Sequence, residues 1–308
     1  MDPSSQVVSL SDGRLLGYAF YGSSSPNAYN IFYFHGIPSS RLEAAILAPY
    51  ASSLNVRIVA IDRPGMGLSN FQDKRQVMDW PLDVVALADH LQLPTFSILA
   101  YSGGAAYALA CARIISSSRL LSVGIMGGVY PLDFKGRYNP MRFFLKPLEK
   151  AITSGISSHV GSSLNNRFGE LARSSNPAAF YEANDKEMQH RPKIEQDALR
   201  EAKIQVLYEP LREALRVDGK GIGRDSELAG SDWGFKLEEI PCGNSGVRIK
   251  VWHGSADVNM PMNLVSDAQK KIDGAELKIL RDVGHIGVLV YHGGEILKDI
   301  AVNARGAY

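Results

Sequence analysis

The chain has 308 residues, of which 45% are hydrophobic and 21% are charged, a composition typical of a globular protein with a sizeable core. Its 33 basic and 32 acidic residues nearly cancel, so charge favours neither a nucleic acid nor an anionic membrane as a partner. Cys111 and Cys242 give no disulfide framework and no metal-site spacing, and we expect no metal and no cofactor. The sequence lacks a signal-peptide pattern and any run of about 18 apolar residues, which predicts a cytoplasmic protein without a membrane span.

The first part of the chain alternates apolar runs with helical patterns. A hairpin is expected over residues 6–21, because turn residues at 11–13 separate two apolar segments. The next strands are expected at residues 30–34, 56–61, 96–99 and 120–126, with helices between them at residues 39–53, 77–91 and 105–113. Strands that alternate with helices build a mostly parallel sheet covered on both faces, here preceded by an antiparallel hairpin.

This alternation stops after the sixth strand. Amphipathic helical patterns follow at residues 141–152 and 193–216, whereas the polar, glycine-rich residues 219–230 predict a mobile loop. The alternation resumes with strands at residues 248–253 and 276–280 and helices at residues 261–272 and 287–300.

The sheet is completed only after this interruption. We therefore interpret residues 131–240 as a helical cap inserted over the strand ends at which open α/β sheets bind ligands. Residues 1–130 and 241–308 then form the α/β core. The alternative is that the insertion is a second, independent domain.

A serine lies at the corner between the strand ending at Leu99 and the helix beginning at Ala105. The sequence Ala-Tyr-Ser-Gly-Gly at residues 100–104 places small residues two positions before and two positions after Ser102. A nucleophile elbow needs this arrangement, because larger side chains at these positions would collide in so tight a turn. The usual form is Gly-x-Ser-x-Gly, and Ala100 adds only one methyl group.

A serine hydroxyl becomes a nucleophile when a base takes its proton, and the base needs an acid that holds its tautomer. Asp257 follows the strand ending at His253, and His285 follows the strand ending near Leu280. The order Ser, Asp, His is the one expected on this type of sheet. The separation of 28 residues between Asp257 and His285 leaves room for one helix and one strand, so their loops can be neighbours.

Together these motifs resemble the capped members of the α/β-hydrolase fold superfamily. The resemblance covers nearly the whole chain outside the interpreted cap and rests on the elbow, His-Gly-Ile-Pro at 35–38, Asp-Arg-Pro-Gly-Met-Gly-Leu-Ser at 62–69, His-Gly at 253–254 with Asp257 and Pro261, and Gly-His at 284–285. Asp-Trp-Gly-Phe at 232–235 is similar to a stretch in plant and fungal members. The resemblance implies an eight-stranded, mostly parallel sheet, with Ser102 as nucleophile, His285 as general base and acid, and Asp257 as its orienting partner.

An oxyanion hole needs two fixed N–H donors aimed at the developing negative charge. We expect one from the backbone of Gly103, directly after the nucleophile, and the other from Ile37 on the loop after the third strand. We also hypothesise that the Ile37–Pro38 peptide is cis, since an X-Pro bond in a tight turn can re-aim the neighbouring amide.

Other residues compete for these roles. Asp133, after the sixth strand, is a rival acid, but the loop of Asp257 matches the motif. His35 and His253 precede glycines at strand ends, and we interpret them as hydrogen-bonded supports of their loops. The apolar residues 143–145 are interpreted as a cap face over a pocket or as core, in preference to a membrane contact.

These observations predict a serine hydrolase that forms an acyl-enzyme from a carboxylic ester or thioester of a small, fairly apolar metabolite. The same residues also suit hydrolysis of a carbon-carbon bond in a diketone. The serine excludes haloalkane dehalogenase and epoxide hydrolase chemistry, which uses an aspartate at the elbow. Two hypotheses from other classes stay open: a non-hydrolytic catalyst of a biosynthetic pathway, such as a cyclase, lyase or acyltransferase, and a ligand receptor.

Overall fold

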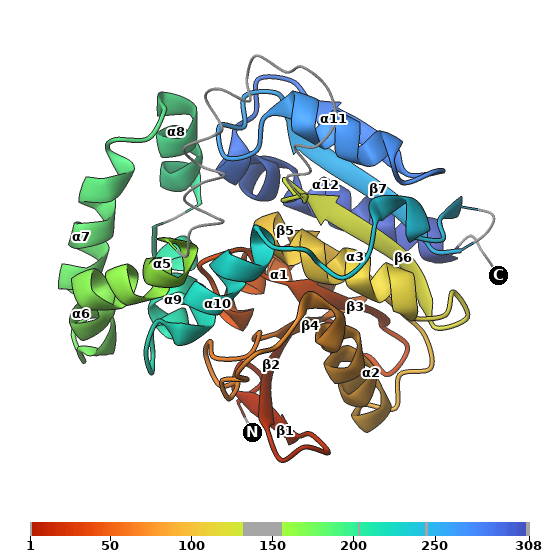
Figure 1. Cartoon of the computed structure of the whole chain (residues 1–308), viewed down its shortest axis with the longest axis horizontal. Coiled ribbons are helices and arrows are strands. Elements are labelled where there is room, and N and C mark those ends of the chain that lie inside the picture. The colour runs from red at the N-terminus through yellow and green to blue at the C-terminus, as the bar shows by residue number, and fades with distance from the viewer. Residues whose placement is uncertain (1, 132–155, 203, 244–245, 306–308) are drawn as a thin grey trace.

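The computed structural model describes residues 2–131, 156–202, 204–243 and 246–305. Eight strands form one sheet in the order β1-β2-β4-β3-β5-β6-β7-β8 (Figure 1). Their bounds are Gln6–Ser9 (β1), Leu15–Gly22 (β2), Tyr29–Phe34 (β3), Val56–Ile61 (β4), Phe96–Tyr101 (β5), Leu120–Met126 (β6), Arg248–Gly254 (β7) and Glu276–Leu280 (β8). Only the β1–β2 and β2–β4 pairs are antiparallel, which confirms the predicted mostly parallel sheet with an antiparallel start.

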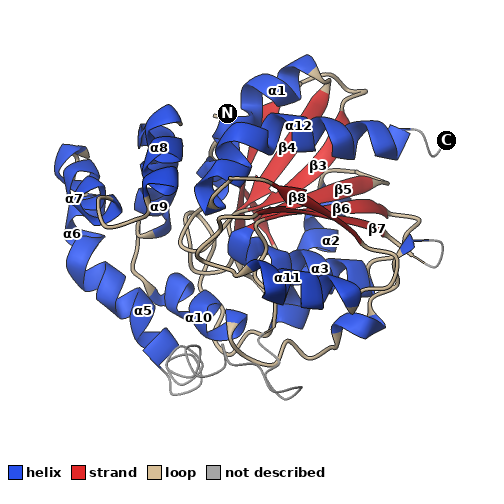
Figure 2. Ribbon diagram, turned by 90° about the horizontal axis from the view of Figure 1, so that it is seen from above, coloured by secondary structure: helices blue, strands red, loops and turns tan. Residues whose placement is uncertain are grey.

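Helices cover both faces of the sheet, as predicted. Figure 2 shows α1 (Ala48–Ser53) and α12 (His285–Arg305) on one face, and α2 (Trp80–His90), α3 (Ala105–Ile114) and α11 (Met262–Lys270) on the other. Successive side chains of a strand point to opposite faces, so β3 contributes to both layers. Phe32 and Phe34 pack in the cluster with α2 and α3, whereas Ile31 and Tyr33 pack with α1 and α12.

A group of helices lies between β6 and β7 in the sequence and beside the sheet in space (Figure 1). They are α5 (Ile156–Leu164), α6 (Glu170–Arg173), α7 (Ala178–Met188), α8 (Lys193–Glu201), α9 (Ile204–Ala214) and α10 (Lys220–Ala229), and we call them the inserted helices. Their apolar cluster, which includes Phe168 and Phe180, also takes in Met66 and packs against Ile37 from two core loops. The inserted helices therefore pack on the loops that follow β3 and β4.

The helices of this segment differ from the sequence-based expectations in two places. The pattern over residues 193–216 forms two helices, α8 and α9, and the loop predicted over residues 219–230 is wrong, because α10 occupies it. The glycines of residues 219–230 allow close packing between helices. A Cβ on Gly219, just before α10, would overlap the carbonyl group of Gly161 in α5. Asp133, residues 143–145 and the helix expected at residues 141–152 lie outside the described residues.

The core-and-cap division at residues 131 and 240 stays a prediction. Among the residues that the structure describes, no helix combines the length and apolar character needed to cross a bilayer.

Candidate active site

The corner after β5 is held in a tight and strained conformation. Ser102 has a φ of 51°, in the left-handed region that non-glycine residues rarely adopt. A Cβ on Gly104 would overlap the carbonyl oxygen of Phe34, so only glycine fits where the chain turns into α3. The side chain of Ser102 is therefore fixed at the carboxyl end of β5, and the residue is only 8% exposed.

The structure brings Ser102, His285 and Asp257 into one chain of hydrogen bonds. The Ser102 Oγ lies 3.0 Å from His285 Nε2, and His285 Nδ1 lies 2.7 Å from Asp257 Oδ2. The other oxygen of Asp257 accepts the backbone N–H groups of Asn259 and Met260 at 2.8 and 3.1 Å. Burial raises the pKa of Asp257, but the hydrogen bond and charge of His285 outweigh it, so the net pKa is lowered and the carboxylate form is favoured.

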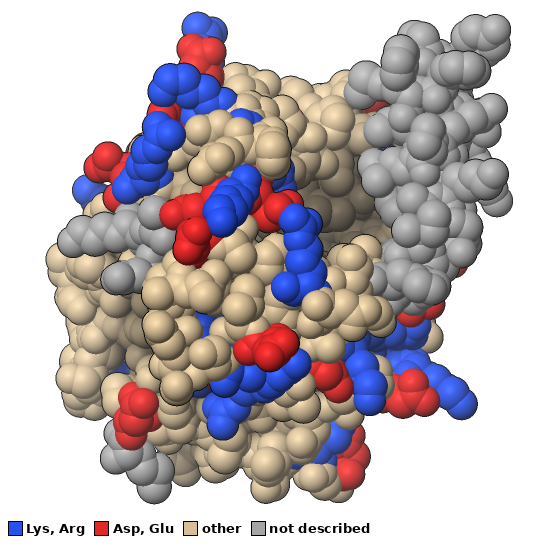
Figure 3. Space-filling view, turned by 90° about the vertical axis from the view of Figure 1, so that its left-hand side faces the viewer, with Lys and Arg blue, Asp and Glu red and all other residues tan. Residues whose placement is uncertain are grey.

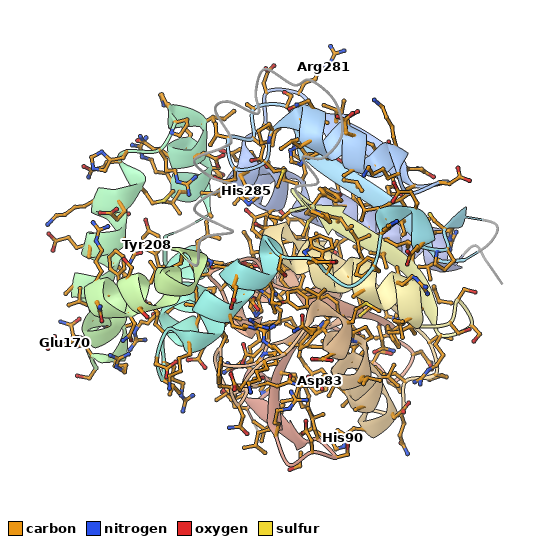
Figure 4. All side chains as sticks on the ribbon, viewed as in Figure 1. Asp83, His90, Glu170, Tyr208, Arg281 and His285 are labelled. Atoms are coloured by element: carbon orange, nitrogen blue, oxygen red, sulfur yellow. The ribbon has the colours of Figure 1, made fainter. Side chains whose placement is uncertain are left out.

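His285 is the first residue of α12, and Figure 4 shows it on the side of the core that faces the inserted helices. Ser102, by contrast, precedes α3 on the opposite face of the sheet. The two residues meet because β5 and the loop after β8 both end at the carboxyl edge of the parallel strands.

The two residues expected to form an oxyanion hole are neighbours. A Cβ on Gly103 would overlap the side chain of Ile37, which places the loop after β3 directly against the residue after Ser102. The Ile37–Pro38 peptide is cis, which confirms the sequence-based hypothesis.

Buried polar groups brace the loop after β3 on two sides. Arg63 donates to the carbonyl oxygens of His35 and Gly36 at 2.5 and 2.8 Å. Glu43 accepts the N–H of Gly36 and the hydroxyl of Tyr33, each at 2.9 Å. Burial raises the pKa of Glu43 despite these donors. The main chain at Gly36 is thus bound through both its N–H and its carbonyl group.

The two histidines interpreted as loop supports have that role. His35 Nδ1 lies 2.8 Å from the carbonyl of Gly36, and its Nε2 accepts the N–H of Arg63 at 3.3 Å. His253 Nε2 donates to the carbonyl of Met260 at 2.9 Å, inside the loop that carries Asp257. Burial lowers the pKa of both imidazoles, so both are neutral hydrogen-bonding groups.

Two carboxylates that sequence reasoning missed reach this region from the inserted helices. Asp225 of α10 is fully buried and accepts from Arg63, Arg75 and the hydroxyl of Tyr107. Burial raises the pKa of Asp225, but the two guanidinium charges outweigh it and hold that pKa well below its usual range. Glu195 of α8 accepts backbone N–H groups at the start of α12.

A sequence signal for both carboxylates exists. Asp225 lies three residues from the buried Ile222 and three from Leu228, and Glu195 lies three residues before the buried Ala198. An acidic residue at core spacing on an amphipathic helix indicates a buried carboxylate that needs donors.

On the face shown in Figure 3, the described lysine, arginine, aspartate and glutamate side chains are interspersed, with both signs of charge side by side. Across the described part of the chain, no three His, Cys, Asp or Glu side chains are grouped so that they could hold a metal ion.

The fold and the site geometry define a member of the α/β hydrolases. The alpha/beta hydrolase family model matches residues 31–297, and the chain belongs to this family. No similar sequence was found among curated proteins.

Solved structures share the architecture over their whole length. The chain is similar to an enol-lactonase from Burkholderia xenovorans LB400 (15% identity, TM-score 0.64, 98% of this chain and 100% of the other). It is also similar to a putative aryl esterase from Burkholderia cenocepacia (14%, 0.66, 98% and 99%) and an esterase from Exiguobacterium antarcticum (16%, 0.64, 98% and 99%). At such identities the likeness shows the common fold.

Proposed function

We propose that this protein is a serine hydrolase that cleaves a carboxylic ester or thioester of a small, fairly apolar molecule. The observation that carries the proposal is the unbroken hydrogen-bond chain from the Ser102 hydroxyl through both nitrogens of His285 to Asp257. Such an arrangement supplies a nucleophile, a base and an orienting acid at hydrogen-bond distances. The similar structures include an enol-lactonase, a putative aryl esterase and an esterase, which agrees with this reaction class.

The proposed reaction has two halves. Ser102 Oγ attacks the carbonyl carbon while His285 Nε2 takes its proton, and Asp257 stabilises the imidazolium that forms. The N–H groups of Ile37 and Gly103 hold the oxyanion. When the tetrahedral intermediate collapses, His285 protonates the departing alcohol or thiol and the acyl group stays on Ser102. A water molecule, deprotonated by His285, then attacks the acyl group, and collapse of the second intermediate returns the proton to Ser102 and releases the acid.

We further propose that residues 131–240 form a cap over this site, with residues 1–130 and 241–308 as the core. The apolar cluster of the inserted helices packs against Ile37, the proposed oxyanion residue. A substrate bound between them would meet apolar side chains, which supports the preference for an apolar substrate. The relation to plant and fungal members suggested by residues 232–235 remains a prediction.

The test is active-site labelling with a fluorophosphonate, followed by intact mass and by turnover of aryl esters and thioesters. We expect one label per chain, no label on Ser102→Ala, and normal labelling of Ser255→Ala, an exposed serine on the Asp257 loop. Stoichiometric labelling with ester turnover supports the hydrolase. Labelling without turnover of the whole panel favours acyl transfer or lyase chemistry, and absence of labelling on the folded wild type refutes the proposed triad and favours a receptor.

A further inference from the structure

His285 is held by its main chain as well as by its ring. Its backbone N–H donates to Glu195 Oε1 at 2.6 Å, and its carbonyl oxygen accepts the hydroxyl of Tyr101 at 3.2 Å. The next N–H, of Ile286, donates to Glu195 Oε2 at 2.8 Å. Both oxygens of one carboxylate therefore bind the first turn of α12 at the residue whose ring lies between Ser102 and Asp257.

Glu195 reaches this position from another part of the chain. It belongs to α8, one of the inserted helices, and precedes His285 by 90 residues. The residue is 0% exposed, and among the described side chains no lysine or arginine lies within 4.0 Å of its carboxylate. A buried carboxylate without a counter-ion is costly unless strong donors bind it. Here those donors are the two N–H groups of α12.

The start of α12 is suited to this contact. The first N–H groups of a helix lack partners within the helix, and the helix dipole favours a negative charge there. A Cβ on Gly284 would lie 2.6 Å from Glu195 Oε1, so the glycine before the histidine leaves the space that the carboxylate fills. Packing of α8 against α12 brings the two together over several residues.

We propose that Glu195 is a positioning residue, which fixes the main chain of His285 so that the imidazole stays between Ser102 and Asp257. This inference rests on the function proposed above and adds a residue from the inserted helices to it. Asp257 orients the ring, but the ring can bridge 3.0 Å to Ser102 only when the backbone of His285 is in place. A displacement of about 1 Å at a reacting group lowers rates by roughly 10²-fold.

The experiment compares Glu195→Ala and Glu195→Gln with Glu213→Ala. Glu213, on α9, also joins an inserted helix to the core, through Arg41 at 2.7 Å, and Arg41 keeps its pair with Asp62 when Glu213 is removed. For each folded variant we measure the second-order rate of fluorophosphonate labelling, kcat and KM for an aryl ester, and Tm.

We expect Glu195→Ala to lower the labelling rate and kcat by about 10²-fold with little change in KM, because the base and not the binding surface is displaced. Glu195→Gln keeps one acceptor oxygen and should lose less. Added formate, which can occupy the vacated carboxylate position, should restore part of the labelling rate of Glu195→Ala only. Glu213→Ala should keep the wild-type labelling rate.

Wild-type labelling rates in folded Glu195→Ala, or in folded Glu195→Gln if the alanine variant does not fold, overturn the inference. An equal loss in Glu213→Ala also overturns it, since general loosening of the inserted helices would then explain the result. Failure of the proposed function gives a different result, because the fluorophosphonate would then not label the wild-type protein either.

Discussion

Replacing Asp225 by alanine should destabilise the fold more than any other single change to a charged residue of the inserted helices. The carboxylate is fully buried between Arg63 and Arg75, and its three donors are the two guanidinium groups and the hydroxyl of Tyr107. Removing it leaves two buried positive charges without a counter-charge.

The structure bounds the size of this effect. Breaking a buried ion pair by removing one partner costs about 3–5 kcal/mol. Two pairs are broken here, but Arg63 keeps two carbonyl acceptors and Arg75 keeps the hydroxyl of Tyr107, so the free energy of unfolding should fall by about the cost of one pair. At about 2 °C per kcal/mol, the midpoint Tm should fall by roughly 6–10 °C.

The assay is thermal unfolding of wild type, Asp225→Ala and Glu227→Ala at neutral pH. Glu227 lies on the same helix, and its pair with Arg224 is partly exposed, so its loss should cost no more than about 1 kcal/mol. A Tm for Asp225→Ala within the range of Glu227→Ala would refute the reasoning that the buried cluster stabilises the fold.

Acid provides a second test of the same cluster. The pKa of Asp225 is held below its ordinary value of 3.8, so the folded state binds fewer protons than the unfolded state in this range. Its contribution to stability is present above that ordinary value and is lost as the pH falls through the lower, folded-state pKa. The difference in stability between wild type and Asp225→Asn should therefore narrow when the pH is lowered below about 4.

Two further substitutions test the site directly. Asp257→Asn should lower kcat by about 10⁴-fold with little change in Tm, because the neutral amide no longer holds the His285 tautomer or stabilises the imidazolium. A kcat within tenfold of the wild-type value would contradict the role proposed for Asp257. Gly104→Ala should slow labelling of Ser102 by roughly 10²-fold, because the added methyl group overlaps the backbone of β3 and displaces the elbow. The control is Ala110→Gly, farther along α3, which should lower the free energy of unfolding by about 1 kcal/mol and leave the labelling rate unchanged.

The core of the fold was predictable because its signals are local. Each strand is a short, largely apolar run, and each proposed catalytic residue lies at most five residues after the end of a strand. Parallel topology therefore brings Ser102, Asp257 and His285 to one edge of the sheet. The polar supports His35 and His253 could also be assigned, since each lies beside a glycine at a strand end.

The inserted helices were less predictable, because tertiary contacts override local preference there. Glycine usually breaks a helix, which is why residues 219–230 suggest a loop. In the structure, however, Gly219 packs against Gly161 and Gly221 against Gly65, and these approaches are too close for any side chain. The loss of helix propensity is offset by backbone contact with partners that the local sequence does not reveal.

Tertiary partners also decide how the inserted helices are bound to the core, so sequence motifs do not predict these contacts. Three successive helices each contribute one carboxylate to the core: Glu195 from α8 binds the start of α12, Glu213 from α9 binds Arg41, and Asp225 from α10 binds Arg63. The contacts of Glu195 and Asp225 reach the main chain of the proposed site. Glu195 binds the start of α12 at His285, and Arg63, the partner of Asp225, binds the carbonyl groups of the loop after β3. A changed helical insertion that keeps the apolar surface but loses Glu195 and Asp225 should therefore lose the geometry of the proposed site along with substrate preference.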